Sequence, residues 1–177
     1  MAGCGEHRRQ CLWRITRRSV LIQFPIQVLE SFEMSVESDQ KPSAFGVHIP
    51  FVAHLGFEMI GFEGGQSEMR FTPKPEHKNS FDVAHGGAIM ALLDVSMATA
   101  ARSIDKTLGV VTIEMKTSFM QPANGTLTAK GRLMHRTKSM AFAETQLFDA
   151  QGRLCAHATG TFKYIVRKPN DPPLSTD

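Results

Sequence analysis

The most constraining feature of this sequence is an apolar run near its middle. Residues 87–101 are all small, apolar or hydroxylic except for Asp94. The run is rich in Ala, Leu and Met, which favour a helix, and a helix that is apolar nearly all round belongs inside a fold rather than on its surface. The run is short for a membrane span, and it carries a charge. We therefore expect one long buried helix that ends near Ser103.

The segments around this run show the patterns of strands and tight turns. Residues 49–56 predict a short helix that is ended by Gly56, and the Gly64-Gly65 pair predicts a hairpin. Strands are expected over residues 57–63, 67–72, 110–120, 126–135, 140–148 and 153–166. One helix cannot cover both faces of a doubly wound sheet, so the order indicates an α+β fold in which an antiparallel sheet wraps around the central helix.

The chain of 177 residues is long enough for one domain with a proper core. We place this domain at residues 45–166, between an N-terminal extension (residues 1–44) and a proline-rich flexible tail (residues 167–177). The extension has five arginines followed by an interrupted apolar stretch, which is the outline of a targeting segment, but no small-x-small cleavage site follows. A disordered native arm and a translation start at Met34 are the alternatives for this region.

Charge, cysteines and missing motifs narrow the class of function. The net charge is +3, and the five Arg and three Glu of residues 1–33 account for +2, so the remaining chain is nearly neutral and has no electrostatic footprint for nucleic acid. Three scattered cysteines argue against a disulfide framework and indicate a reducing, cytoplasmic compartment. His77 and His85 have no partners at metal-ligand spacing. Phosphate-cradling, dinucleotide-binding and Gly-x-Ser-x-Gly motifs do not occur.

The N-terminus of the expected helix and its single carboxylate, Asp94, are the candidate reactive groups. Gly86 and Gly87 fall where the first unpaired N–H groups should be, and without side chains they let a ligand oxygen approach the backbone. The helix N-terminus is also partly positive, which suits a carbonyl oxygen that gains negative charge. Asp94 lies among apolar residues, so it should be hard to ionise unless it is paired or faces a cavity. The plainer alternatives are close packing at the glycines and a structural Asp94 bonded to backbone or Ser96.

The spacing of His85 and Asp94 adds a geometric constraint. Nine residues at about 1.5 Å and about 100° each place them roughly 13 Å apart, on opposite faces of a helix. One helix therefore cannot bring both of them to the same reacting carbonyl. If both act, a second copy of the chain should supply one of them, which indicates an oligomer with sites between subunits.

The spacing of Asn79, of the His85-Gly86-Gly87 triplet and of Asp94 resembles that in the hotdog-fold acyl-CoA thioesterases of the PaaI-like group, within the 4-hydroxybenzoyl-CoA thioesterase superfamily. Residues 109–123 also resemble this family's central strand and its exit, and the match covers residues 45–166. The resemblance implies hydrolysis of an acyl- or aryl-CoA thioester to free acid and coenzyme A. Gly86 N–H would be the oxyanion donor, and Asp94 would be the nucleophile or general base. It further implies a homodimer or a homotetramer built as a dimer of dimers, with no metal or separate cofactor, because coenzyme A is part of the substrate.

The same resemblance implies supporting roles for other residues, each with a plainer alternative. His85 would polarise the carbonyl or orient the loop, or else cap the helix. Asn79 would hydrogen-bond the acid or the loop, or else serve as a turn residue. Thr112 would steady the attacking water, or else be an ordinary strand residue. Contacts to coenzyme A are expected from Gly87, Arg136, Lys138 and Ser139, although the last three residues also fit a solvated hairpin tip.

Two other functions stay open from the sequence. A non-catalytic acyl-CoA-binding module would keep the pocket and the glycines but would not need Asp94. A hotdog dehydratase would need a His base beside an acid, and His85 at a helix start followed by two glycines is the wrong setting for that base. The acyl group stays open between aryl and medium-chain groups. Candidates for its pocket are Phe51, Leu55, Phe57, Phe81 and Met90.

Overall fold

The computed structural model describes residues 49–166, so the predictions for the N-terminal extension and the tail lie outside the described residues. The helices are α1 (Pro50–Leu55) and α2 (Gly86–Arg102). The strands are β1 (Glu58–Glu63), β2 (Gln66–Phe71), β3 (Leu108–Phe119), β4 (Leu127–Arg136), β5 (Met140–Phe148) and β6 (Leu154–Val166). Every predicted helix and strand is present, with ends that differ from the prediction by at most two residues.

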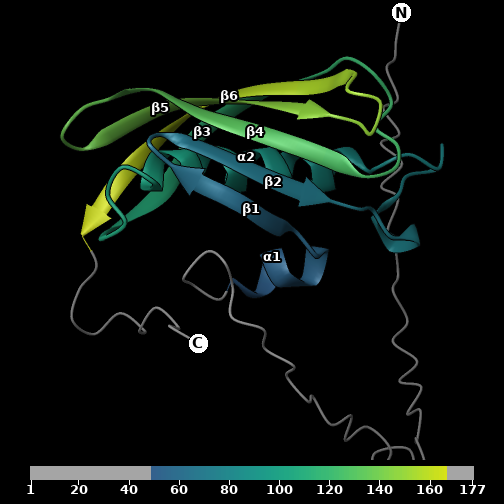
Figure 1. Ribbon diagram of the computed structural model, residues 1–177, viewed down its shortest axis with the longest axis horizontal. Coiled ribbons are helices and arrows are strands. Elements are labelled where there is room, and N and C mark those ends of the chain that lie inside the picture. The colour runs from purple at the N-terminus through teal and green to yellow at the C-terminus, as the bar shows by residue number, and fades with distance from the viewer. Residues whose placement is uncertain (1–48, 167–177) are drawn as a thin grey trace, which may run out of the picture. The chain divides into compact units, whose positions relative to one another are not determined.

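The strands form one six-stranded antiparallel sheet in the order β1-β2-β4-β5-β6-β3. The sheet curves around α2, which lies against its concave face (Figure 1). The predicted α+β hotdog fold, with an antiparallel sheet wrapped around one long helix, is confirmed. Within residues 49–166 no helix combines the length and the apolar character that a membrane span requires.

Helix α2 packs one face on the sheet and leaves one flank open. Side chains with no exposed surface on the packed face are Leu92, Leu93, Ser96 and Met97. On the open flank, Met90 is 40% exposed, and Asp94 and Ala98 are half-buried. The predicted long central helix is present, but one flank is not covered by the sheet, because within residues 49–166 no strand lies beyond β3.

Strand β3 is one edge of the sheet, and it is long for an edge strand. Among the strands of residues 49–166 it pairs with β6 alone, and its exposed side chains include Val111, Ile113 and Phe119. The register shifts between Thr112 and Glu114, where one strand carries an extra residue. An edge of this length presents a row of backbone N–H and C=O groups to which another strand can pair.

A short 3₁₀ helix (Pro75–His77) lies between β2 and α2. His77 is buried there, with its ring 5.4 Å from the ring of Phe71, and its Nδ1 accepts a hydrogen bond from Lys74 N–H. His77 carbonyl oxygen accepts the N–H of His85 at 2.8 Å. The 3₁₀ helix thus anchors the residue from which α2 starts.

Candidate active site

The N-terminus of α2 leaves one glycine N–H free. His85 is the N-cap, and its Nδ1 accepts the N–H of Gly87 at 2.9 Å. No hydrogen bond within residues 49–166 uses the N–H of Gly86. The structure therefore separates the two glycines, because Gly87 donates to its own cap while Gly86 remains available to a ligand.

Gly86 lies beside the aromatic ring of Phe119 at the end of β3. A Cβ atom placed on Gly86 would lie 3.5 Å from Phe119 Cζ, which is an ordinary van der Waals contact. A Cβ on Gly87 would lie 3.1 Å from His85 Nδ1, which is tight enough to disturb the cap. The ring of Phe119 therefore forms one wall beside the free N–H of Gly86.

Asn79 holds the loop that precedes α2. Its Oδ1 accepts the N–H groups of Phe81 at 2.9 Å and of Val83 at 3.4 Å, and its backbone N–H donates to Val83 O. Asp82 closes this turn with a left-handed φ of 57°. Because Oδ1 is occupied, the Asn79 side chain can offer its amide N–H₂ to a ligand.

A cavity of about 370 Å³ opens at this end of α2, within the usual size range of ligand sites. Its lining is mostly apolar and has two amide side chains. The lining residues are Asn79, Val83, Ala84, Gly86, Ile89, Phe119, Met120, Gln121, Pro122 and Ala123. None of the aromatic and aliphatic residues that the sequence suggested for the pocket is among them, since Leu55 and Phe57 belong to the core while Phe51, Phe81 and Met90 are exposed.

Asp94 lies on the open flank of α2, and its carboxylate meets β3. Thr112 Oγ1 donates a hydrogen bond to Asp94 Oδ1 at 2.7 Å. Burial raises the pKa of Asp94 above its ordinary value, and the Thr112 hydrogen bond opposes this by favouring the ionised form. Ser96, considered as a structural partner for Asp94, bonds Ser67 instead. The structure thus brings Asp94 and Thr112 together.

Within one chain, Asp94 and Gly86 do not meet. They lie eight residues apart on the same helix, or roughly 12 Å along its axis, and Asp94 does not line the cavity at Gly86. The structure therefore joins Gly86, Asn79 and the cavity at one end of α2, and Asp94 and Thr112 near its middle.

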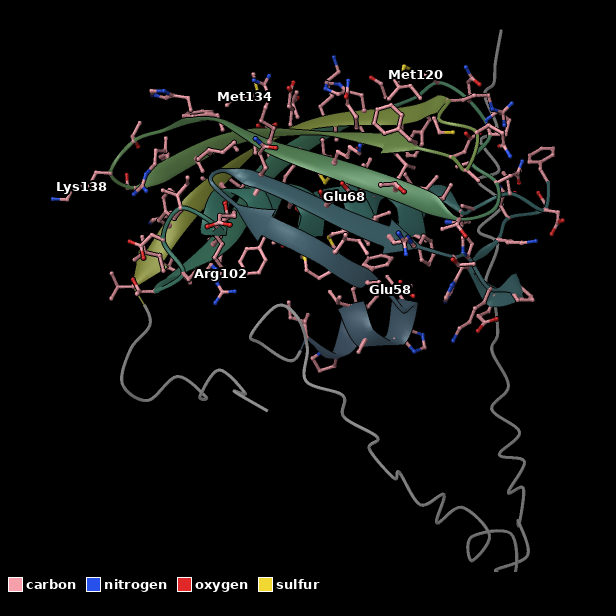
Figure 2. All side chains as sticks on the ribbon, viewed as in Figure 1. Glu58, Glu68, Arg102, Met120, Met134 and Lys138 are labelled. Carbon is pink, nitrogen blue, oxygen red and sulfur yellow. The ribbon has the colours of Figure 1, made fainter. Side chains whose placement is uncertain are left out.

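The β4–β5 hairpin lies at the other end of α2. Arg136 stacks over the ring of Tyr164 at 5.1 Å, and Tyr164 Oη donates to Ala101 O in the last turn of α2. Figure 2 shows Lys138 at the opposite end of the sheet from Met120, which lines the cavity. Arg136, Lys138 and Ser139 therefore do not contribute to the cavity at Gly86 of their own chain. Among residues 49–166 no cluster of His, Cys, Asp and Glu could hold a metal ion.

Sequence reasoning did not assign roles to Phe119 and Gln121, although both line the cavity. The signal that could have found them is the strand exit that ends at Pro122, which follows directly on the strand that carries Thr112. A chain that turns at a proline beside the start of α2 places the last residues of β3 next to Gly86.

The chain is similar in sequence to known proteins. Residues 81–156 match the model of a family described as the thioesterase superfamily. SSO2140 of Saccharolobus solfataricus, named as a candidate esterase, is 31% identical over 114 residues, which are 64% of this chain and 81% of that protein. The medium/long-chain acyl-CoA thioesterase YigI of Salmonella typhimurium is 25% identical over 67% of this chain and 87% of its own length.

Solved structures show the same fold. The conserved protein PA5202 of Pseudomonas aeruginosa matches 70% of this chain and all of its own, with a TM-score of 0.66 and 25% identity. The PaaI protein of the Escherichia coli phenylacetic acid degradation operon matches 67% of this chain and 86% of its own, with a TM-score of 0.63 and 23% identity.

Proposed function

Because the chain belongs to the thioesterase superfamily and is a thioester hydrolase, we propose that it hydrolyses an acyl- or aryl-CoA to free acid and coenzyme A. The observation that carries the proposal is the free Gly86 N–H at the N-terminus of α2, beside an apolar cavity. A thioester carbonyl that accepts this N–H would develop its negative charge where the helix dipole is favourable. The Asn79 amide, which lines the same cavity, is placed to supply a second donor.

Asp94 supplies the base or nucleophile in this proposal. As a general base, its carboxylate takes a proton from a water molecule whose oxygen attacks the thioester carbon, and the C–S bond then breaks to release the coenzyme A thiol. As a nucleophile, a carboxylate oxygen attacks the thioester carbon and the C–S bond breaks, which leaves an anhydride and releases the coenzyme A thiolate to take up a proton from water. Water then hydrolyses the anhydride to the free acid and restores the Asp94 carboxylate. Thr112 donates its hydrogen bond to Oδ1, so in either route the other carboxylate oxygen, Oδ2, would act on the reacting atoms. Neither route requires a metal or a redox cofactor.

The site is completed by a second copy of the chain. The free edge of β3 allows antiparallel pairing with the β3 of a partner. Pairing centred on Met115 and Lys116 would place Phe119 opposite Thr112 of the partner subunit. Phe119 lies beside Gly86 in its own chain, and Thr112 is hydrogen-bonded to Asp94 in its own chain. This register brings the oxyanion donor and the acid to one carbonyl. We propose a homodimer on this basis, or a dimer of dimers.

The expected result of the first test is loss of thiol release in Asp94→Asn. Acyl-CoA substrates with aryl and medium-chain groups would be assayed by free-thiol release, with Asp105→Asn as a matched control. The Asp105 carboxylate accepts hydrogen bonds from Thr107 beyond the C-terminal end of α2, and Asp105 does not line the cavity. Asp94→Asn that keeps full activity would refute the role of Asp94. Binding of acyl-CoA without any thiol release by the wild-type chain would instead identify a non-catalytic binding module.

Mixing two inactive variants tests whether the site is shared between subunits. Asp94→Asn and Gly86→Pro, which lacks the N–H, would each be inactive alone. Random reassembly should return about one quarter of the wild-type activity, because half of the dimers are mixed and each mixed dimer has one intact site. Absence of any recovery after verified subunit exchange would contradict a site built from two chains.

A further inference from the structure

Three hydroxyl groups that the proposed reaction does not use meet in the interior beneath α2. They come from Ser67 on β2, Ser96 on α2 and Thr145 on β5, and all three residues are buried. Ser67 Oγ donates to Ser96 O at 2.7 Å, and Ser67 Oγ and Ser96 Oγ lie 3.1 Å apart. Thr145 Oγ1 donates to Ser96 Oγ at 3.3 Å. The Ser67 hydroxyl proton is donated to the Ser96 carbonyl oxygen, so the hydrogen bond between the two Oγ atoms is donated by Ser96 to Ser67. Each of the three hydroxyl protons therefore has an acceptor.

Gly131 on β4 completes this arrangement, which we call the hydroxyl anchor (Ser67, Ser96 and Thr145 above Gly131). Ser67, Gly131 and Thr145 are neighbours in one row across three strands. A Cβ atom on Gly131 would lie 2.5 Å from Ser67 Oγ and 2.7 Å from Ser96 O. Gly131 therefore leaves room for α2 to approach the sheet closely, and the Ser67 side chain of β2 bonds the backbone carbonyl of Ser96.

The hydroxyl anchor lies on the opposite side of α2 from the carboxylate. Ser96 follows Asp94 by two residues, which corresponds to about 200° of rotation around a helix. Ser96 is fully buried against the sheet, whereas Asp94 is half-buried on the open flank, near the exposed Met90. Apolar contacts are non-directional and permit a helix to rotate or slide, whereas hydrogen bonds fix distance and angle. The anchor therefore adds a directional restraint on the sheet side of α2, opposite the Thr112–Asp94 hydrogen bond on the open flank.

We infer that the hydroxyl anchor is a positioning element that sets the rotation of α2 and so holds the Asp94 carboxylate against Thr112. This inference rests on the proposed function, because it assigns Ser67, Ser96 and Thr145 to the geometry of that reaction. None of these residues touches the substrate in this proposal. They act through the helix, and a small misplacement of a reacting group has a large effect on rate.

The test compares Ser67→Ala with Thr99→Ala in the full-length chain. Thr99 is a matched control, because its buried hydroxyl donates to Val95 O at 2.6 Å inside α2 and does not tie the helix to the sheet. Single-turnover thiol release and the dissociation constant of a non-hydrolysable acyl-CoA thioether would be measured for each variant. Ser67→Ala should slow the single-turnover step on the order of tenfold or more and change the dissociation constant less than about twofold. Thr99→Ala should leave both values within about twofold of wild type.

A second variant keeps the test decisive if Ser67→Ala does not fold. Thr145→Val keeps the side-chain shape and removes only the 3.3 Å bond, so it should give the same pattern with a smaller loss of rate. A folded Ser67→Ala that cleaves as fast as wild type, or one that loses binding and rate in equal proportion, overturns the inference and leaves the proposed function intact. A wild-type chain that releases no thiol from any acyl-CoA overturns the proposed function itself.

Discussion

Replacing Gly86 by proline removes the backbone amide hydrogen that is the proposed main donor to the oxyanion. Gly86 is the first residue of α2, a position where proline is favourable because the missing N–H has no partner inside the helix. The preceding residue, His85, is extended with a ψ of 138°, which is the conformation that a residue before proline prefers. A Cβ on Gly86 has an ordinary contact distance to Phe119. Gly86→Pro should therefore keep the fold while deleting the donor.

The size of the effect follows from the loss of one donor. Gly87 N–H is held by His85 and cannot substitute for it, so the loss should equal that of an oxyanion-hole donor in other hydrolases, about 100- to 1,000-fold in kcat or about 2.7–4 kcal/mol. Stability should stay unchanged or rise by roughly 0.4–1 kcal/mol, because proline restricts the unfolded chain more than glycine does. A variant with a disturbed fold would lose stability together with kcat. A loss of kcat at unchanged or increased stability would therefore indicate loss of the donor itself.

Thiol release from acyl-CoA, thermal unfolding and size-exclusion chromatography would be measured for Gly86→Pro and for Gly86→Ala. Gly86→Ala is the matched control, because it adds the Cβ and keeps the N–H, so its loss of rate should be much smaller. A Gly86→Pro variant that folds, assembles and turns over within a few-fold of wild type would show that the Gly86 N–H does not bind the oxyanion.

Further predictions concern the neighbours of the two reacting groups. His85→Asn should retain most activity, because Asn can also cap a helix, whereas His85→Ala should lose activity and about 1 kcal/mol of stability in a thermal unfolding assay. Thr112→Val should raise the pKa of Asp94 further and move the acid limb of the kcat/KM profile to higher pH, because activity is lost as the ionised carboxylate takes up a proton. Thr117 Oγ1 is buried with no hydrogen-bond partner among the described residues, so Thr117→Val should raise the free energy of unfolding by about 1 kcal/mol in urea denaturation. Thr145→Val, which removes the buried hydrogen bond to Ser96 Oγ, should lower the free energy of unfolding in the same assay.

The elements of the fold were predictable because their signals are local. Gly56 ends α1 in a left-handed conformation with a φ of 71°, as a glycine after a short helix predicts. In β4, Leu127, Ala129 and Gly131 are buried on one face, as the alternation of the sequence predicts. Neither result depends on how the strands are ordered.

The geometry of the site was less predictable because it depends on strand order and on register. The shift between Thr112 and Glu114 breaks the alternation of β3, so the sequence could not tell whether Thr112 faces α2. The cavity joins residues 79–89 to residues 119–123, which approach only after the whole sheet has formed. The family resemblance implied coenzyme A contacts for the basic hairpin, but only the topology places Arg136 beside Tyr164 at the far end of α2.

The open flank of α2 carries information about the assembled protein. This helix is apolar nearly all round, yet within residues 49–166 its flank with Met90 and Asp94 is not fully covered, and Val111 and Ile113 of β3 are exposed. A second copy paired along β3 would cover the flank and the edge together, and would remove more water from Asp94. The pKa of Asp94 should then be raised further in the dimer than in the single chain, because burial is the cause of the shift. The β3 pairing that places the partner's Gly86 near Asp94 would therefore also raise the pKa of Asp94. Preventing this pairing should abolish both dimer formation and thioester hydrolysis.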